Sequence, residues 1–583
     1  MSKLNQVEKQ SAVKLSFTDP QVFDRSDESE FSRRFDLNRN YVNSLKVDNL
    51  LQNHYTEAAI RNWNHFTEDC HKGWESPVCQ LRGHFTGHWL SAAARIYAQT
   101  GDMEVYGKAC RFVDELAKCQ RANGGRWAGS IPEKYFWKME QGQSIWAPHY
   151  TVHKLFMGLA DMKRYGDSNK ALEIASSWAD WFIEWTDKFS RSEMDRILDY
   201  ETGGMLEAWV DLYDLSGDEK FRLLIDRYYR PKLFERLLAG EDVLTLRHAN
   251  TTIPEIHGCA RAYEVFGDEK YRRICEEYWK QAVTERGWFA TGGQTACEVW
   301  TPKHKFANRL ARTNQEHCTV YNMIRLADFL YRWSGDVQYL DYIERNLYNG
   351  ILAQQNRNTG MVIYYLPLHS GAKKAWGTPT DDFWCCHGSL VQAHTLYAQL
   401  ACYSGDDTLT VAQFIPGFVE YKDAKVNIDY NLNYDTQALL RITVAGDERT
   451  AFDVKIRVPW WTTEVTVNGQ AQPKPENGFV TVSVKGKLSE INVVFGKEMI
   501  LVPIPDEPTT AAFMNGPEVL AGICDREQVI TIPKGNPRGA FRMYDEADWH
   551  PACYHLIGQG IKFVPISTIV DETYTVYFPI REE

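Results

Sequence analysis

A short pattern that ends one helix and prepares the next recurs along the first two thirds of the chain. Gly-Asp follows an aromatic residue within a few positions six times, with the glycines at 101, 166, 217, 267, 335 and 405. Glycine ends a helix readily in the left-handed backbone conformation, and the Asp after it can cap the next helix. Intervals of roughly 50–70 residues leave room for two helices each. Six helix hairpins in succession predict an (α/α)6 barrel; the alternative is six unrelated helix ends in an irregular helical domain.

The period of the apolar residues changes near residue 406. Segments such as 87–99 and 319–333 place apolar residues at i, i+3, i+4 and i+7, which is helical spacing. Segments such as 425–434 and 438–446 instead alternate with period two, and turns such as Asn-Gly separate them. The predicted fold class is therefore mainly α with β. We expect the barrel over 31–405, an antiparallel β-sandwich region over 406–583, and an N-terminal segment, 1–30, with a strand near 13–24 that joins the sandwich.

Charge and hydropathy exclude several classes of partner. The net charge is −12 and the chain has no Lys/Arg-rich run, so we expect no nucleic-acid partner. No stretch reaches the roughly 18–20 apolar residues of a membrane span. The sequence starts MSKLNQVEKQ, without the apolar segment of a signal peptide, so we expect a cytoplasmic protein. The C-terminal sandwich is a candidate surface for a homodimer.

Two short segments bring together groups that bind metals. Glu316-His317-Cys318 precedes an amphipathic helical segment, and Cys385-Cys386-His387 begins another. In a chain expected to keep its thiols reduced, clustered cysteines indicate a metal or catalysis rather than disulfides. Zn²⁺ binds Cys, His and carboxylate ligands in tetrahedral sets, so both a Glu-Cys₃ set and a set that includes His are chemically reasonable.

A thiol in such a site can become a nucleophile. Zinc coordination deprotonates a thiol whose ordinary pKa is about 8.5. In a retaining glycosidase the thiolate would attack the anomeric carbon, a role that usually falls to Asp or Glu. A second group must protonate the leaving oxygen, and the candidate is Glu298, which follows the Gly292-Gly293 turn. The alternative for Glu298 is an ordinary surface carboxylate.

The run from Gly83 to about Asp525 resembles the β-L-arabinofuranosidases of glycoside hydrolase families 127 and 146. The resemblance rests on the following matching pieces: GHFTGHWLSA (83–92), WAPHYTVHK (146–154), GGM (203–205), HANTTIP (248–254), GGQTACE (292–298), EHC (316–318), ERNLYNGILAQQ (344–355), YYLPLHSG (364–371) and FWCCHG (383–388). It implies an (α/α)6 barrel with appended β-sandwiches and an enzyme that releases β-L-arabinofuranose, or a related unusual plant cell-wall sugar, from oligosaccharides.

The resemblance also implies roles for individual residues. The zinc ligands would be Glu316, Cys318, Cys385 and Cys386, with Cys385 as the nucleophile and Glu298 as the general acid/base. Polar residues in the other matching pieces become candidates for binding sugar hydroxyls: His84, His88, His153, His248 and Tyr364. For each histidine the alternative is a core or helix-capping side chain. The chain departs from the family pattern at His317 and at His387-Gly388-Ser389, which puts the identity of the sugar in doubt but leaves the ligands intact.

Two other functions fit the same sequence. The first is a helical-barrel glycosidase or lyase that uses carboxylate chemistry from Asp161, Glu207 or Asp211 beside a structural zinc. The second is a non-catalytic carbohydrate-binding or scaffolding protein, which the sandwich and the aromatic content of 13% permit.

Overall fold

Two concentric rings of helices form the larger part of the protein. The computed structural model describes residues 24–25, 29–60, 69–405, 407–544 and 553–583. Six inner helices pack each against the next, and the sixth packs against the first, which closes the ring. The inner helices are α5 (His84–Thr100), α8 (Pro148–Gly166), α11 (Met205–Ser216), α14 (Ile253–Phe266), α16 (His317–Ser334) and α18 (Cys385–Ala393).

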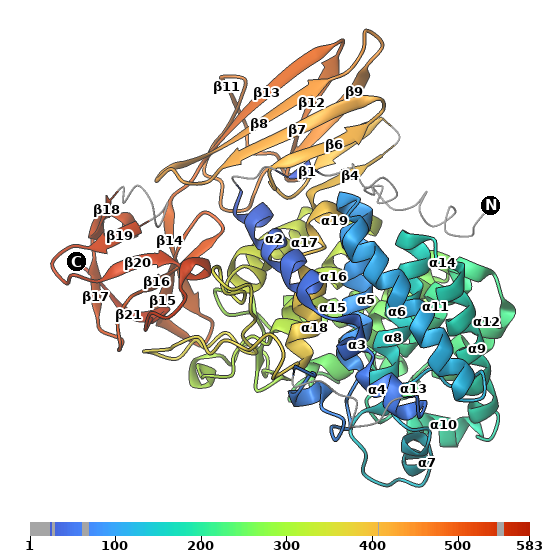
Figure 1. The fold of residues 1–583 in the computed structure, drawn as a ribbon. Helices are drawn as coiled ribbons and strands as arrows, with labels where there is room; N and C mark the ends of the chain where they lie inside the picture. The colour runs from blue at the N-terminus through green and yellow to red at the C-terminus, as the bar shows by residue number, and fades with distance from the viewer. Residues whose placement is uncertain (1–23, 26–28, 61–68, 406, 545–552) are drawn as a thin grey trace.

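The outer ring supplies one covering helix for each inner helix. Chain order alternates between the rings, so every inner helix runs in the same direction and begins at the same end of the barrel. The outer helices are α2 (Glu30–Ser44), α6 (Met103–Ala122), α9 (Asn169–Thr186), α12 (Glu219–Tyr228), α15 (Glu269–Trp279) and α17 (Val337–Asn346). The predicted (α/α)6 barrel is confirmed (Figure 1).

The Gly-Asp pattern ends the inner helices as predicted at four of its six positions. Gly101, Gly217, Gly267 and Gly335 each take the left-handed conformation and donate their N–H to a tyrosine carbonyl four residues earlier. The Asp that follows each of them caps the next outer helix through its side chain. At the second position the pattern shifts by one residue: Gly166 is still helical, Asp167 is left-handed and Ser168 caps α9.

The sixth prediction of a helix end, at Gly405, is wrong. Gly405 follows strand β4 (Cys402–Ser404) and donates its N–H to the carbonyl of Thr408, at the start of β5 (Thr408–Val411). Gly405 thus lies between the two strands of a β-hairpin; Asp406 lies outside the described residues. Pairing of β4 with β5 decides the conformation, because Gly-Asp favours any tight reversal of the chain.

Strand-rich layers follow the barrel and lie beside it (Figure 1). The first layer is a seven-stranded sheet in the order β1-β6-β7-β8-β13-β10-β11, and the second has the order β12-β9-β5-β4. Their period-two burial places alternate residues in a shared core, as β7 (Ala424–Asn431) and β8 (Gln437–Ala445) illustrate. The remaining bounds are β6 (Gly417–Tyr421), β9 (Ala451–Arg457), β10 (Val465–Val467), β11 (Gln470–Gln472), β12 (Phe479–Lys485) and β13 (Leu488–Gly496).

Two strand pairs depart from the expected antiparallel arrangement. β5 runs parallel to β9, and β17 (Ile530–Ile532) runs parallel to β21 (Tyr577–Glu582). A two-residue strand, β1 (Asp24–Arg25), pairs with β6; of the strand expected near 13–24, residues 13–23 lie outside the described residues.

The last strands form a separate eight-stranded sheet that supports loops of the barrel. One face shares a core with loop residues such as Phe289, Ile363 and Leu368, and the other face has its own core around Phe513 and Phe563. The further strands of this sheet are β14 (Met499–Ile504), β15 (Glu507–Asn515), β16 (Glu518–Gly522), β18 (Phe541–Tyr544), β19 (Cys553–Leu556) and β20 (Lys562–Pro565). None of the helices in the described ranges combines the length and apolar character needed to cross a membrane.

The first two inner helices approach closely because small residues face each other. A Cβ on Gly87 of α5 would collide with the backbone carbonyl of Lys154 on α8, and one on Gly158 would lie 2.6 Å from the Gly87 carbonyl oxygen. Backbone atoms cannot yield as a flexible side chain can, so these glycines set the spacing of the two helices.

We therefore expect Gly87→Ala to lower the free energy of unfolding by about 1–3 kcal/mol or more, because the added methyl group overpacks the contact. The matched control is Gly107→Ala on outer helix α6, where a new Cβ meets nothing within 4 Å. That change should raise the free energy of unfolding by up to about 1 kcal/mol, through helix propensity alone. Denaturant unfolding of both variants measures the difference; equal effects of the two changes would show that the contact does not set the spacing.

Candidate functional site

A cavity of about 680 Å³, including its opening to solvent, lies at the end of the barrel where the inner helices begin. Every inner helix contributes to its wall through its first two turns or the loop before it. The contributing residues include His88 (α5), Lys154 (α8), Glu201 (before α11), Pro254 (α14), Cys318 (α16) and Cys385 (α18). Helix N-termini carry partial positive charge, so six of them favour anionic groups in this cavity.

Three thiols and one carboxylate meet at one side of the cavity. The ligand atoms of Glu316, Cys318, Cys385 and Cys386 all lie within 4.8 Å of one another. The Cys318 sulfur lies 3.6 Å from that of Cys386, which lies 3.9 Å from that of Cys385. The Cys385 sulfur lies 3.5 Å from Oε1 of Glu316. Adjacent cysteines can converge because Cys385 and Cys386 are the first two residues of α18, where the chain turns from a loop into the helix.

Burial dominates the electrostatics of these four groups. Burial raises the pKa of the Cys385 and Cys386 thiols well above the ordinary value, and burial followed by the charge of Cys385 does the same for the pKa of Glu316. Burial also raises the pKa of Cys318, but hydrogen bonds with Cys385 and Cys386 outweigh it and bring that pKa to about 7. None of the four pairs with a Lys or Arg in the described part of the chain. Such a cluster suits a metal cation.

Neighbouring polar groups orient the carboxylate and one thiol. Asn250 Nδ2 donates to Oε2 of Glu316 at 2.6 Å, and Thr319 Oγ1 donates to the same oxygen at 3.2 Å. The other oxygen, Oε1, is thereby left facing the Cys385 sulfur. Ser389 Oγ lies 3.1 Å from the Cys318 sulfur. The arrangement resembles the outer hydrogen bonds that fix the ligands of metal sites.

The two histidines of these motifs turn away from the cluster. Nδ1 of His317 lies 2.9 Å from Ser389 Oγ, and Nε2 of His387 lies 3.0 Å from the Thr378 carbonyl oxygen. The sequence left open a ligand set that includes histidine. The described residues bring together the Glu-Cys₃ set instead.

Four short extended segments, far apart in sequence, lie in a row beside the cluster. His248 pairs with Val299, Ala296 pairs with Asn314, and Glu316 pairs with Tyr365. A two-stranded hairpin, β2 (Thr295–Ala296) and β3 (Val299–Trp300), forms the second segment of the row. The row thereby places His248, Glu298, Glu316 and Tyr364 side by side.

Glu298 projects from the turn of that hairpin. Cys297 and Glu298 are its two turn residues, with φ of 51° and 65°, so the segment is not extended at these positions. Two positive φ values are typical of a type I′ hairpin turn, but for residues other than glycine they are uncommon and cost about 1 kcal/mol or more each. Cys297 is exposed and its sulfur lies 2.9 Å from Thr313 Oγ1, while Glu298 lines the cavity.

Tyr364 connects Glu298 with the thiol cluster. Its hydroxyl donates to Oε1 of Glu298 and lies 3.4 Å from the Cys385 sulfur. His248 Nε2 lies 3.3 Å from Oε2 of Glu298. Burial raises the pKa of Glu298, but hydrogen bonds with His248 and Tyr364 outweigh it, so that pKa is lowered. Glu298 is therefore ionised in the ligand-free cavity at neutral pH.

The five residues predicted to bind sugar divide into two groups. His88, His248 and Tyr364 line the cavity. His84 and His153 are buried outside its lining. Nε2 of His84 lies 2.8 Å from the Phe383 carbonyl oxygen and Nδ1 lies 3.3 Å from the Tyr150 hydroxyl, so both ring nitrogens already have protein partners. His84 thus positions the segment that leads into Cys385.

Several residues of the cavity wall were not predicted from the sequence. Lys154 and Glu201 place opposite charges in it, and Tyr321 contributes a phenol. Trp74 and Trp146 pack edge to face with ring centroids 5.0 Å apart, and Trp146 is 46% exposed, at the open side of the cavity. Lys154 and Trp146 lie within one of the matching sequence pieces, at 146–154, so a signal for them was present.

The carboxylates proposed for an alternative chemistry lie elsewhere. Asp161, Glu207 and Asp211 do not line the cavity. Asp161 and Asp211 belong to a belt of buried ion pairs towards the other end of the inner helices, whose members are Arg95–Asp161, Arg164–Asp161, Arg164–Asp211, Arg261–Asp211, Arg261–Glu264, Arg332–Glu264 and Arg332–Asp328. Glu207 lies in the first turn of α11 and pairs with Arg325. Their charges are engaged in holding neighbouring helices together.

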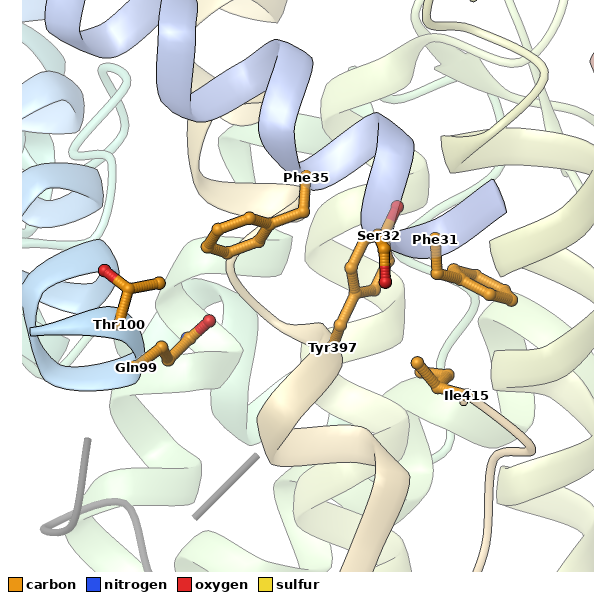
Figure 2. A pocket seen from close by; sticks show the side chains of 7 residues that line it. All are labelled: Phe31, Ser32, Phe35, Gln99, Thr100, Tyr397 and Ile415. Atoms are coloured by element: carbon orange, nitrogen blue, oxygen red, sulfur yellow. The ribbon is translucent and has the colours of Figure 1, made fainter. Parts of the chain in front are cut away.

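A second hollow, of about 290 Å³, lies between α2, the end of α5 and α19 (Tyr397–Ala401) (Figure 2). Phe31, Phe35, Tyr397 and Ile415 form most of its lining, and no acidic or basic side chain lines it. It is a packing gap between helices, without the groups needed for catalysis.

The sequence and the structure both match one group of known proteins. The profile of the β-L-arabinofuranosidase GH127 catalytic domain matches residues 25–399, and that of the GH127 middle domain matches residues 408–495. A comparison with curated protein sequences gives no match.

Solved structures of low sequence identity share the fold over nearly the whole chain. A GH127 β-L-arabinofuranosidase from Geobacillus stearothermophilus T6 is 15% identical with a TM-score of 0.72, covering 96% of this chain and 100% of that one. A second GH127 β-arabinofuranosidase is 15% identical with a TM-score of 0.71, covering 98% of each chain. Since the two family profiles together span well over half of the sequence, this chain belongs to the GH127 β-L-arabinofuranosidase family of glycoside hydrolases.

Proposed function

We propose that Glu316, Cys318, Cys385 and Cys386 hold one Zn²⁺ ion. The observation that carries the proposal is the spacing of the four ligand atoms. Around a tetrahedral zinc with Zn–S bonds of about 2.3 Å and a Zn–O bond of about 2.0 Å, two sulfurs lie about 3.8 Å apart and a sulfur and an oxygen about 3.5 Å apart. The corresponding distances here are 3.6 and 3.9 Å between sulfurs and 3.5 Å from sulfur to oxygen. When bound, the ion would keep the thiols deprotonated at neutral pH.

Cys385 is the nucleophile in this proposal. It is the partly exposed member of the adjacent pair and lines the cavity, whereas Cys386 is completely buried. Its sulfur attacks the anomeric carbon of the sugar, and the bond from that carbon to the leaving oxygen breaks. A sulfur–carbon bond then links the sugar to the enzyme until water replaces the sulfur, which returns to Cys385 as a thiolate. Two displacements at one carbon retain its configuration.

Glu298 serves as the general acid/base. It gives a proton to the leaving oxygen in the first step and takes one from water in the second. The lowered pKa of Glu298 suits the second role. A bound sugar displaces water from around the carboxylate, which raises the pKa and favours the protonated form that the first role needs. The Tyr364 hydroxyl, between Glu298 and the Cys385 sulfur, orients both groups.

The substrate we propose is an oligosaccharide with a terminal β-L-arabinofuranosyl unit or a related plant cell-wall sugar. The named activity of the family supports the sugar. The cavity supports attack on a terminal unit, because it opens at one end of the barrel while the ion-pair belt and the packed inner helices occupy the other. Asp161, Glu207 and Asp211 do not line the cavity and each pairs with an arginine, which disfavours carboxylate chemistry as the alternative.

Loss of one ligand should release the metal. We expect elemental analysis in reducing buffer to find about one zinc per chain in the wild type and little in Cys318→Ser, because three remaining ligands bind the ion far more weakly. Cys297→Ser is the matched control, since Cys297 is exposed and outside the cluster. A folded wild-type protein without zinc would refute the metal proposal.

Loss of either reacting group should abolish turnover. We expect Cys385→Ala and Glu298→Gln to reduce kcat/KM on an oligosaccharide with a terminal β-L-arabinofuranosyl unit by about 10²–10⁴-fold or more, because Cys385 attacks the reacting carbon and the leaving sugar oxygen needs the proton that Glu298 supplies. Cys297→Ser should keep wild-type rates. An epoxide inhibitor of β-L-arabinofuranose configuration should label Cys385, which peptide mass mapping can locate. Labelling of a carboxylate instead would rule out the thiolate mechanism.

Oxidation should inactivate the enzyme reversibly at first. A thiolate that faces solvent is oxidised to sulfenic acid or pairs with a neighbouring thiol, and both products return to thiols with a reductant. We expect activity to fall on storage in air and to recover on addition of dithiothreitol, with rates followed on the same substrate. Activity that is indifferent both to air and to iodoacetamide would contradict a catalytic thiolate.

A further inference from the structure

Two oppositely charged side chains face the cavity without a hydrogen-bond or ion-pair partner in the described part of the chain. Lys154 projects from the second turn of α8, and Glu201 lies in the loop before α11. Neither side chain forms a hydrogen bond or ion pair with another described residue. The Lys154 ammonium lies 4.6 Å from the centroid of the Tyr150 ring, and its longer-range electrostatic neighbours include Cys318, Glu201 and Cys385. Glu201 has only longer-range electrostatic neighbours, of which His248 and Lys154 are the strongest.

Lys154 differs from the other buried lysines of the described residues in lacking a hydrogen-bond partner. Lys154, Lys374 and Lys497 are the lysines buried among the described residues. The ammonium of Lys374 donates to three carbonyl oxygens at 2.7, 2.8 and 3.0 Å, and that of Lys497 donates to the Leu432 carbonyl at 2.8 Å. A buried ammonium that lacks such bonds loses much of its hydration without compensation. Lys154, with 8% of its surface exposed, is therefore incomplete until a ligand supplies an acceptor.

Two neutral groups of the same wall are also incomplete. Nε2 of His88 and the hydroxyl of Tyr321 are buried and have no hydrogen-bond partner, and both residues line the cavity. Buried polar atoms are nearly always paired. These two buried groups, together with the unbonded Lys154 ammonium and Glu201 carboxylate that face the same cavity, suit a ligand with several hydroxyl groups.

The charges around the cavity favour a neutral ligand over an acidic one. Glu201 and Glu298 line it together with Glu316 and the thiols, and a bound divalent cation would leave the set strongly negative. An acidic sugar would meet repulsion from these groups despite Lys154. A pair of hydroxyls satisfies both charges, since one oxygen can accept from an ammonium while another O–H donates to a carboxylate.

We propose that Lys154 and Glu201 bind two neighbouring hydroxyls of the sugar in the cavity, with Lys154 donating to one and Glu201 accepting from the other. This inference rests on the proposed function for the location of the sugar, and it adds two specificity-determining residues to it. The selection of one sugar over another should then depend on hydroxyl groups away from the anomeric carbon. A sugar that lacks one of the two should bind as weakly to the wild type as the complete sugar binds to the matching variant.

The test compares Lys154→Met and Glu201→Gln, which keep side-chain size, on a p-nitrophenyl β-L-arabinofuranoside and its singly deoxygenated analogues. On the complete sugar we expect each variant to lose about 10- to 100-fold in kcat/KM. For each variant, one deoxy analogue lacks the hydroxyl that the mutated side chain would bind. On that analogue the variant and the wild type should have almost the same kcat/KM, because the interaction is absent from both. Lys163→Met is the control for α8, because Lys163 is a half-buried residue in the last turn of the same helix whose ammonium binds Asp167 and Asn169 and does not line the cavity.

Equal losses on every analogue would overturn the inference, because they would mean that the residues act through the fold or the thiol cluster. Zinc content and thermal unfolding of each variant separate those two causes.

Calorimetric titration with free L-arabinose distinguishes this failure from failure of the proposed function, because binding requires no turnover. Binding to the wild type that is lost in both variants would support the inference even if no glycoside were cleaved. Cleavage by the wild type with unchanged L-arabinose binding in both variants would refute the inference alone.

Discussion

The common direction of the six inner helices determines where chemistry can occur in this protein. Because each outer helix returns the chain to the same end of the barrel, all six inner helices begin around one cavity. Their unpaired N–H groups and aligned dipoles make that end favourable for anions. Cys318, Cys385 and Cys386 each occupy the first or second position of such a helix. Thiols and carboxylates that would be costly to bury elsewhere can therefore be gathered here.

The other end of the barrel is held by charge pairing. The belt of arginines and carboxylates joins α5, α8, α11, α14 and α16 in succession, with most members buried. A buried pair contributes little net stability over apolar packing, but removing one partner is costly because the other charge is left alone. The belt therefore specifies which helices are neighbours more than it adds stability. It also keeps carboxylates such as Asp161 and Asp211 away from the cavity.

The parts of the fold that depend on local chemistry were predictable from the sequence. The left-handed glycines at 101, 217, 267 and 335 end helices as predicted. The spacing of apolar residues in the sequence distinguished the helices of the barrel from the strands of the sheets. Gly405 was mispredicted because Gly-Asp favours a hairpin turn as well as a helix end, and strand pairing decides between them.

The thiol and carboxylate cluster was predictable as a set of residue types. That histidine is not part of the cluster, and that Glu298 occupies a strained hairpin turn, could be learned only from the folded chain. Lys154 and Glu201 were missed because a charged residue in sequence gives no sign that it lacks a partner.

One wall of the cavity is held in place by residues from the C-terminal part of the chain. Lys374 donates to the carbonyls of Ile566 and Ile569, and the Tyr574 hydroxyl donates to the Pro367 carbonyl, so the connection between β20 and β21 holds both sides of the loop that starts at Tyr364. During synthesis the adjacent cysteines leave the ribosome long before these strands exist. The hydroxyl that lies between Glu298 and the Cys385 sulfur is therefore held through contacts made by the last part of the chain to be translated. A truncation near residue 560 would leave all four thiol and carboxylate groups in the chain but remove the contacts that fix the loop beside them.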